Sequence, residues 1–298
     1  MRLDFGVHLG LNQVGDPAPD RLAYYEQLLA IGEGALSALW VSDHLQKDDA
    51  PVLEAWTTLT YLAALAPSFR VGHLVLSQSY RNPALLAKMA ATLQMLTGGR
   101  FVLGLGAGWQ ADEYHAYGFP FPSAGERIAQ LGEAIDLIRA MWSGSPASYA
   151  GRHYRVEGAH CEPRPEPHPP ILVGGQGQKV MRMVAEKADA WHWDGPIEIY
   201  RPPYDRLAAH CETIGRDISK IKLLAGIEVY FPADSADFPQ PYWSGYENFM
   251  TTPFGPTPAD AIAMMQPMIE LGVTEFTVIF WDSQSARSFV DKVIPAMR

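Results

Sequence analysis

The segment ILVGGQGQKVMRMVAEKADAWHW, residues 171–193, decides the fold class. It opens with an apolar run at 171–175, which is typical of a parallel strand buried on both faces. A glycine-rich turn, a helical stretch and a second apolar run at 188–193 follow. Strand, helix and strand in this order predict one unit of a parallel α/β fold.

The same alternation extends outward to both ends of the chain. Strand candidates lie at residues 4–10, 38–44, 71–77, 101–108, 171–175, 188–193, 221–231 and 274–281. Eight strands separated by helices predict a closed (β/α)₈ barrel, with residues 1–298 as one domain. A doubly wound open sheet is the alternative, because it needs no closure and commonly uses fewer strands.

Helix boundaries are marked by capping residues. Asn82 and Pro83 are expected to open a helix that Gly98-Gly99 stops, Thr257-Pro258 to open another, and Ser283 to cap the last. Apolar residues recur at helical spacing at Ile128, Leu131, Ile135, Ile138 and Trp142.

Two insertions interrupt the alternation, one after the fourth helix at about 143–170 and one after the seventh strand at about 232–256. The first is rich in Pro, Gly and His, and residues 147–156 resemble a small hairpin. The second contains five prolines and several aromatic residues. Loops of this length inside a compact domain are usually functional or disordered, and the aromatic content argues against disorder.

Composition excludes several classes of protein. The net charge of −10 disfavours nucleic acid as a partner. The two cysteines form no disulfide framework, the N-terminus lacks the features of a signal peptide, and no apolar run is long enough to span a membrane. We therefore expect a cytoplasmic protein that acts on a small molecule.

In barrels of this type the active site lies at the carboxyl ends of the strands. The fourth candidate strand, FVLGLGAGW, places Gly104, Gly106 and Gly108 two residues apart and therefore on one face. A face without side chains suits a flat ring, whereas the alternative is close packing of a helix. Trp109 stands where a dinucleotide-binding fingerprint would need glycine.

The turn GGQGQ at 174–178 precedes a helix whose first amides suit a phosphate or carboxylate. Lys179 and Arg182 lie nearby, but the turn has no Walker pattern. The alternative is an ordinary turn that needs glycines for its geometry.

The pair Asp43-His44 ends the second candidate strand. A histidine there suits hydrogen bonding or proton transfer, and the alternative is a solvated strand end. His153, His160 and His168 have no matching carboxylate pattern, so no metal is predicted. The aromatic residues of the second insertion, with Tyr242, Trp243 and Tyr246, are candidates for substrate selection.

Taken together, these residues resemble the superfamily of bacterial-luciferase-like flavin monooxygenases and coenzyme F420-dependent oxidoreductases. The resemblance runs through LWVSDH at 39–44, the long block at 80–142 and the segment at 167–192. It implies a barrel with a flavin or deazaflavin at its carboxyl end, and a non-proline cis peptide near His73-Leu74-Val75. Asp-His at 43–44 favours coenzyme F420, with FMN as the alternative.

The resemblance also implies roles for individual residues. Cofactor binding is expected at His8, Asp43, His44, Leu74, Val75, Gly106, Ala107, Gly108, Trp109, Gly174, Gly175, Gln176, Gly177 and Gln178. Substrate contacts are expected at Trp109, His192, Trp193, Tyr242, Trp243 and Tyr246. His44 is the expected proton donor or hydrogen-bond partner, with Asp43 orienting it or contacting the ring.

One departure concerns the substrate. The F420-dependent sugar-phosphate dehydrogenases carry a catalytic glutamate where this chain has Trp109. Glu113 lies nearby but receives no role from the sequence. The leading hypothesis is a homodimeric oxidoreductase that transfers hydride to or from a small organic molecule. The alternatives are an FMN-dependent monooxygenase, a lyase or isomerase for a phosphorylated substrate, and a non-catalytic flavin-binding barrel.

Overall fold

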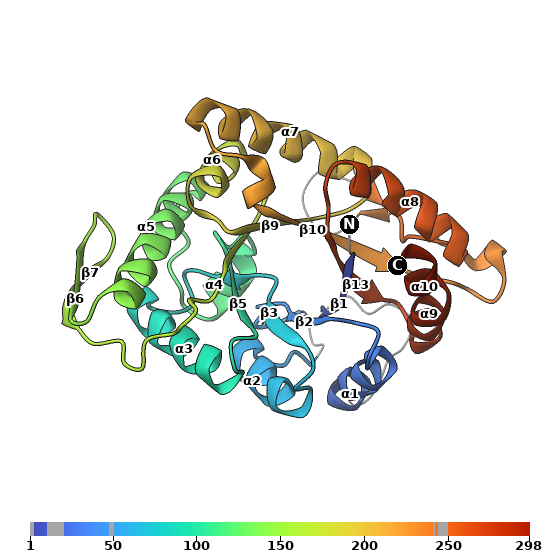
Figure 1. The fold of residues 1–298 in the computed structure, drawn as a ribbon, viewed down its shortest axis with the longest axis horizontal. Coiled ribbons are helices and arrows are strands. Elements are labelled where there is room, and N and C mark those ends of the chain that lie inside the picture. Colours follow the sequence, from blue (N-terminus) through green and yellow to red (C-terminus); the bar gives the residue numbers. More distant parts are fainter. Residues whose placement is uncertain (1–2, 11–20, 48–50, 241, 244–249) are drawn as a thin grey trace.

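Eight parallel strand positions form a closed barrel in the computed structural model, which describes residues 3–10, 21–47, 51–240, 242–243 and 250–298 (Figure 1). The strands are β1 (Asp4–Leu9), β2 (Ala38–Val41), β3 (Arg70–His73), β4 (Leu76–Ser77), β5 (Phe101–Gly106), β8 (Ile171–Gly174), β9 (Ala190–Asp194), β10 (Lys222–Val229) and β13 (Glu275–Phe280). β3 and β4 share one position, and the pairing of β3 with β5 closes the ring. Closure confirms the barrel and excludes the open sheet.

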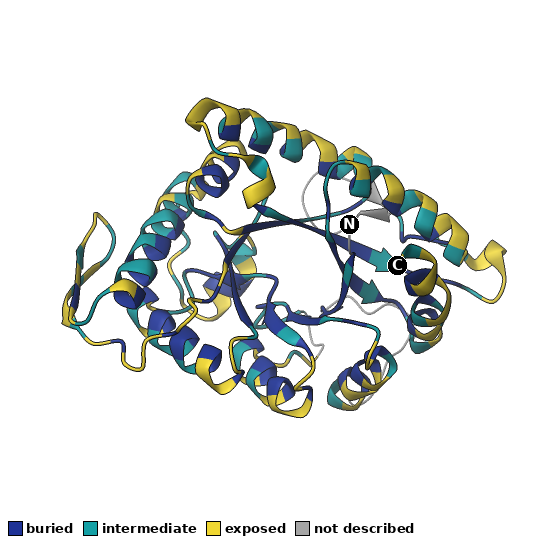
Figure 2. Cartoon of the chain, in the orientation of Figure 1, coloured by how far each residue is buried: buried dark blue, intermediate teal, exposed yellow. Residues whose placement is uncertain are grey.

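Helices surround this ring, with their buried faces toward the strands (Figures 1 and 2). They are α1 (Arg21–Gly32), α2 (Ala55–Leu65), α3 (Pro83–Leu96), α4 (Ala111–Ala116), α5 (Ala124–Ser143), α6 (Gln178–Lys187), α7 (Ile197–Ile214), α8 (Pro258–Glu270), α9 (Ser283–Ser288) and α10 (Ile294–Met297). None of the helices in the described ranges is long and apolar enough to cross a membrane.

The helix caps agree with the sequence at two places and differ at a third. The side chain of Asn82 accepts hydrogen bonds from the first amides of α3, and Thr257 forms a capping box with Asp260 at α8. The prediction that Ser283 caps the last helix is wrong. Asp282 is the cap of α9 because its carboxylate reaches the amide of Ser285.

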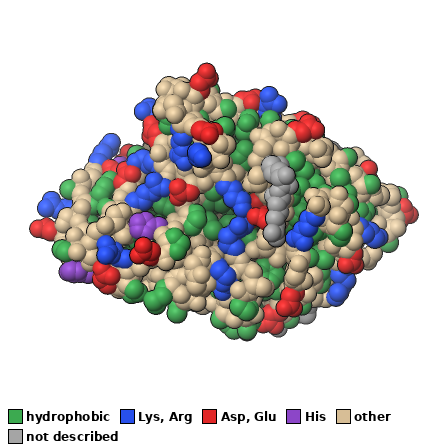
Figure 3. Space-filling view, in the orientation of Figure 1, with side chains coloured by type: hydrophobic (Ala, Val, Ile, Leu, Met, Phe, Trp, Pro, Cys, Tyr) green, Lys and Arg blue, Asp and Glu red, His purple; other side chains and the backbone are tan. Residues whose placement is uncertain are grey.

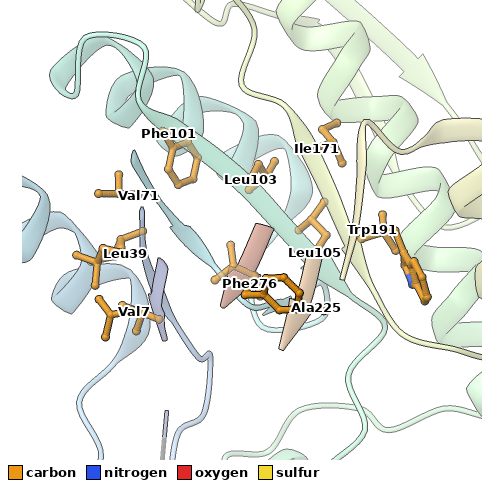
Figure 4. Packing of buried hydrophobic residues seen from close by; sticks show 14 of the residues in the cluster. Val7, Leu39, Val71, Phe101, Leu103, Leu105, Ile171, Trp191, Ala225 and Phe276 are labelled. Atoms are coloured by element: carbon orange, nitrogen blue, oxygen red, sulfur yellow. The ribbon is translucent and has the colours of Figure 1, made fainter. Parts of the chain in front are cut away.

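Alternating strand residues build two apolar layers. The outer layer fills the space between strands and helices, and includes Val7, Leu39, Phe101 and Trp191 (Figure 4). The inner layer fills the barrel and is dominated by Trp40. These two layers explain why the strands read as nearly continuous apolar runs.

The amino end of the barrel is closed by an ionic network. The buried Glu275 accepts hydrogen bonds from Trp40 Nε1 and Arg70, and forms an ion pair with Lys222. Figure 3 shows side chains of both charges close together near the middle of one face. The opposite, carboxyl end is therefore the place for a ligand.

Both insertions contain short antiparallel pairs. In the first, β6 (Ala147–Ala150) pairs with β7 (Arg155–Ala159), which confirms the predicted hairpin. In the second, β11 (Tyr242–Trp243) pairs with β12 (Met250–Thr251). Tyr246 lies outside the described residues, as do the side chains of Tyr242 and Trp243, so their predicted substrate role stays a prediction.

Candidate functional site

A cavity of about 330 Å³ lies at the carboxyl ends of the strands. The chain brings most of the predicted site residues to its wall: Asp43, His44, Leu74, Val75, Gly106, Ala107, Gly108, Trp109, Gly174, Gly175, Gln176, Gly177, His192 and Trp193. Two predicted residues, His8 and Gln178, do not line it. His8 is buried below the wall, and Gln178 is exposed and lies 3.2 Å from Nε2 of His210.

His44 is held by a carboxylate that the sequence did not assign. Its Nδ1 lies 3.0 Å from Oε1 of the buried Glu113, on α4. The same carboxylate accepts hydrogen bonds from the amides of Leu45 and Gln46 and from the hydroxyl of Tyr80. Burial opposes ionisation, but these hydrogen bonds lower the pKa of Glu113. An ionised Glu113 fixes the ring so that its Nε2 remains available for a ligand.

Asp43 does not orient His44, which corrects the expectation from the sequence. Its carboxylate binds Arg81 through both oxygens, at 2.9 and 3.0 Å, and also accepts the amide of Ser77. Burial raises the pKa of Asp43, and Arg81 opposes that shift. Adjacent residues point in different directions here, so Asp43 braces the wall whereas His44 contacts Glu113.

The glycines of β5 serve a different purpose from the one predicted. The peptide bond between Leu74 and Val75 is cis, as the resemblance implied, and it separates β3 from β4. A Cβ added at Gly106 would lie 2.6 Å from Val75, and one at Gly174 would lie 3.0 Å from it. The face is therefore not bare, because Gly106 in β5 and Gly174 in β8 make room for the Val75 side chain, whereas a Cβ at Gly104 would lie 1.9 Å from the backbone carbonyl of His73.

Gly108 lies beyond the end of β5 and has a φ of +75°. A Cβ at this position would lie 1.8 Å from the hydroxyl of Tyr114, which is hydrogen-bonded to Ser77. Gly108 is therefore required by its own backbone and by Tyr114 rather than by a ring.

The glycine turn after β8 has open amides. Gly177 is the N-cap of α6, with no side-chain capping bond, and a Cβ added there would meet no atom within 4 Å. Gly175 has a φ of +132°, a conformation that favours glycine. Free amides at a helix N-terminus are the observation that fits an anionic group at this turn. Arg127, from α5, lines the same cavity.

A polar floor lies at the inner end of the cavity. His192 Nε2 is 3.0 Å from Oγ1 of Thr277, and His8 Nε2 is 2.8 Å from Oγ of Ser42. Burial lowers the pKa of His8 to about 4 and that of His192 to about 3. Both rings are therefore neutral at physiological pH. Asp194, from the end of β9, completes the floor.

Sequence reasoning missed Glu113, Tyr80, Arg127 and Asp194 as wall residues. Asp194 follows the predicted strand end at Trp193 directly, so the rule for barrel strand ends could have found it. Glu113 and Arg127 lie on helices, where the sequence carries no comparable signal. No group of three His, Cys, Asp or Glu suited to a metal occurs among the residues that the structure describes.

Comparisons with known proteins identify the family of the chain. Residues 6–266 match the family described as luciferase-like monooxygenase. The F420-dependent glucose-6-phosphate dehydrogenase of Kineococcus radiotolerans is 34% identical over 58% of this chain and 52% of that protein, so the chain spans about half the length of this relative. The protein of the same name from Nakamurella multipartita is 30% identical over 77% of this chain and 68% of its own.

A solved structure shows the same fold. An F420-dependent secondary alcohol dehydrogenase, in complex with an F420-acetone adduct, superposes with a TM-score of 0.83. The alignment covers 100% of both chains at 20% sequence identity.

Proposed function

The chain belongs to the luciferase-like monooxygenase family, and on that premise we propose that it is an oxidoreductase that transfers hydride between coenzyme F420 and a small organic molecule. The observation that carries the proposal is one cavity that joins an amide-rich glycine turn, an apolar ridge at Val75 and the His44–Glu113 pair. The F420-dependent relatives support the deazaflavin, with FMN as the alternative.

The residues of the cavity fit such a cofactor. The uncapped first amides of α6, which follow the N-cap Gly177, would hold its phosphate, and Val75 would support one face of its ring. The rings of Trp109 and His44 meet edge-on, with their centroids 6.0 Å apart. Trp109 would therefore form a wall beside the cofactor ring and the substrate. When bound, the cofactor supplies a carbon centre that accepts or donates hydride, and the protein supplies position and exclusion of water.

His44 would carry the proton that accompanies the hydride. When an alcohol is oxidised, its C–H bond gives up the hydride and its hydroxyl proton passes to Nε2 of His44. In the reverse direction His44 returns that proton to the carbonyl oxygen. Glu113 acts through His44 as a positioning residue, because its carboxylate holds Nδ1.

A binding titration tests the proposal. Apo protein is titrated with coenzyme F420 and with FMN, each oxidised and reduced, by fluorescence and calorimetry. We expect saturable binding of coenzyme F420 that is tighter than that of FMN. Tighter binding of FMN would favour a flavin monooxygenase, and no binding of either would overturn the proposal.

We also infer that the protein works as a cytoplasmic homodimer. The two cysteines, Cys161 and Cys211, are buried free thiols, as suits a reducing compartment. Helices α2 and α3 are neighbours in the ring of helices (Figure 1). Four large apolar side chains on them are more than half exposed: Leu65 (52% exposed), Leu85 (56%), Met95 (55%) and Leu96 (67%). Such a surface is typical of an interface between subunits.

Light scattering tests the dimer. Replacing Leu85 and Leu96 together by glutamate should convert a dimer to a monomer, because two charges would then lie in the apolar contact. Ile214→Glu, at an exposed apolar residue of α7, is the matched control and should leave the mass unchanged. A wild-type monomer, or a dimer that survives the double substitution, would contradict the inference.

A further inference from the structure

The Asp194 carboxylate is turned into the barrel rather than away from it. A Cβ added at Gly226, on the neighbouring strand β10, would lie 1.8 Å from Oδ1 of Asp194 and 2.9 Å from Nε2 of His192. Glycine at position 226 therefore leaves the space that this carboxylate occupies. The Asp194 side chain lines the cavity and is 29% exposed.

Asp194 differs from the other two acids of the wall, because the carboxylates of Asp43 and Glu113 both accept hydrogen bonds from protein groups. Asp43 has the Arg81 guanidinium, and Glu113 accepts hydrogen bonds from His44, Tyr80 and two amides. In the described part of the chain no donor is hydrogen-bonded to the Asp194 carboxylate. Nε2 of the neighbouring His192 lies 3.6 Å from Oδ1 of Asp194, which is too far for a hydrogen bond.

The neighbouring histidines do not supply a positive charge. Burial holds the pKa of both His8 and His192 well below neutrality, so both rings are uncharged there. Nδ1 of the buried His8 has no hydrogen-bond partner among the described residues. The floor therefore offers a ligand one acceptor that lines the cavity, the carboxylate of Asp194.

Cations are scarce around the whole cavity. Arg127 is the only lysine or arginine among the described residues that line it. Its guanidinium donates to the carbonyl groups of Gly108 and Pro122 and stacks at 3.9 Å on Phe121. Residues 11–20, 48–50 and 244–249, which lie outside the described part, contain neither lysine nor arginine in the sequence.

We propose that Asp194 determines substrate class: the cavity takes an unphosphorylated compound that carries, besides the reacting hydroxyl, a second hydroxyl that donates to Asp194, and it rejects phosphorylated compounds. The inference rests on the proposed function and deepens it. It sets this chain apart from the relatives named for glucose 6-phosphate. An unpaired carboxylate in a partly desolvated site repels a phosphate dianion much more strongly than it would in water.

Burial raises the pKa of Asp194. The test therefore measures anion binding to the holoenzyme at pH 8, because a higher pH favours the ionised carboxylate. Protein saturated with coenzyme F420 is titrated with glucose 6-phosphate and with inorganic phosphate, followed by calorimetry. We expect no binding to the wild type in the low millimolar range, and at least about tenfold tighter binding to Asp194→Asn. Asp205→Asn removes the same charge from an exposed site on α7 and should behave as the wild type.

Two results would overturn the proposal: tight binding of glucose 6-phosphate to the wild type, or equal anion affinity in the wild type and Asp194→Asn. If Asp194→Asn does not fold, Asp194→Ser removes the same charge with a smaller side chain. Cofactor saturation is recorded first, so failure of the proposed function is detected separately. In that case the comparison is made in apo protein carrying Gly177→Val, which blocks the glycine turn as a second anion site.

Discussion

The proposed chemistry of the site depends on one pair of residues, His44 and Glu113. They are 69 positions apart in the sequence and meet at 3.0 Å. Asp43, next to His44 in the chain, is instead held by Arg81. Proximity in the sequence is a poor guide to partnership where a strand has ended, because successive side chains diverge.

Replacing His44 tests its role in proton transfer. His44→Ala should slow the hydride step by at least roughly a hundredfold, because general acid–base catalysis typically contributes ~10²–10⁴-fold. Stopped-flow measurement, with enzyme saturated by cofactor, reports this step. An unchanged rate of the hydride step would mean that the His44 side chain is only solvated and has no catalytic role. A variant that loses only cofactor affinity would show that His44 binds the cofactor ring instead.

A double variant tests the pairing itself. Glu113→Gln should slow the same step, because the amide loses the charge that holds Nδ1 of His44. Adding Glu113→Gln to His44→Ala should then cost little more than His44→Ala alone, since residues that act as a unit are not additive. Additive losses would show that Glu113 acts independently of His44.

Among the elements, the turn between β8 and α6 shows most directly how sequence encodes a site. Its glycines could be recognised from the sequence because strand, turn and helix are local patterns. The reason for Gly106 in β5 could not, because it depends on Val75, which lies in a separate part of the chain between β3 and β4. The cap at Asp282 was missed for a smaller reason, since two adjacent residues both suit an N-cap.

A substitution in this turn separates cofactor binding from folding. Gly177→Val should weaken cofactor binding by at least about tenfold, because a branched side chain would cover the free amides. Folding should persist, since an added Cβ meets no atom within 4 Å and the φ of −67° is ordinary. Titration with coenzyme F420, beside a thermal melt, checks both points. Gly177→Ala is the smaller control, and wild-type affinity in Gly177→Val would reject a phosphate site here.

At the scale of the whole molecule, the first strand of the barrel, β1, pairs with β2 on one side and with the last barrel strand, β13, on the other. The first and last strands therefore depend on each other, and we infer that residues 1–298 unfold as one unit. The closure could be predicted because the alternation of strands and helices is visible along the chain. The ionic network at Glu275 could not, because its members come from separate strands.

Acid stability follows from buried histidines. Burial lowers the pKa of His8 to about 4, and those of His73 and His192 to about 3, from 6.5. Below pH 6.5 the unfolded chain binds protons that the folded protein does not. The free energy of unfolding is therefore unaffected by these histidines above pH 6.5 and decreases as the pH falls from 6.5 toward 4.

His73 gives a test of this linkage, because its ring packs between Trp56 and Phe101 and lies away from the cavity wall. His73→Phe should reduce the loss of unfolding free energy between pH 7 and pH 5 by about 2 kcal/mol. Urea unfolding at the two pH values measures the difference. His160→Phe, at an exposed position, should leave the loss unchanged. An equal loss in His73→Phe and the wild type would contradict the prediction.

The contact of Val75 with Gly106 and Gly174 also constrains how this protein can evolve. While valine stays at 75, a Cβ added at Gly106 would lie 2.6 Å from its side chain and one at Gly174 would lie 3.0 Å from it, so a larger residue at either position requires the Val75 side chain to shift. A lineage that enlarges Gly106 is expected to shorten the side chain at 75 first. If Gly106 were enlarged first, its new side chain would collide with Val75. Substitutions at Val75, Gly106 and Gly174 are therefore expected to accumulate in a defined order. A library that varies these three positions together should recover working combinations that single substitutions miss.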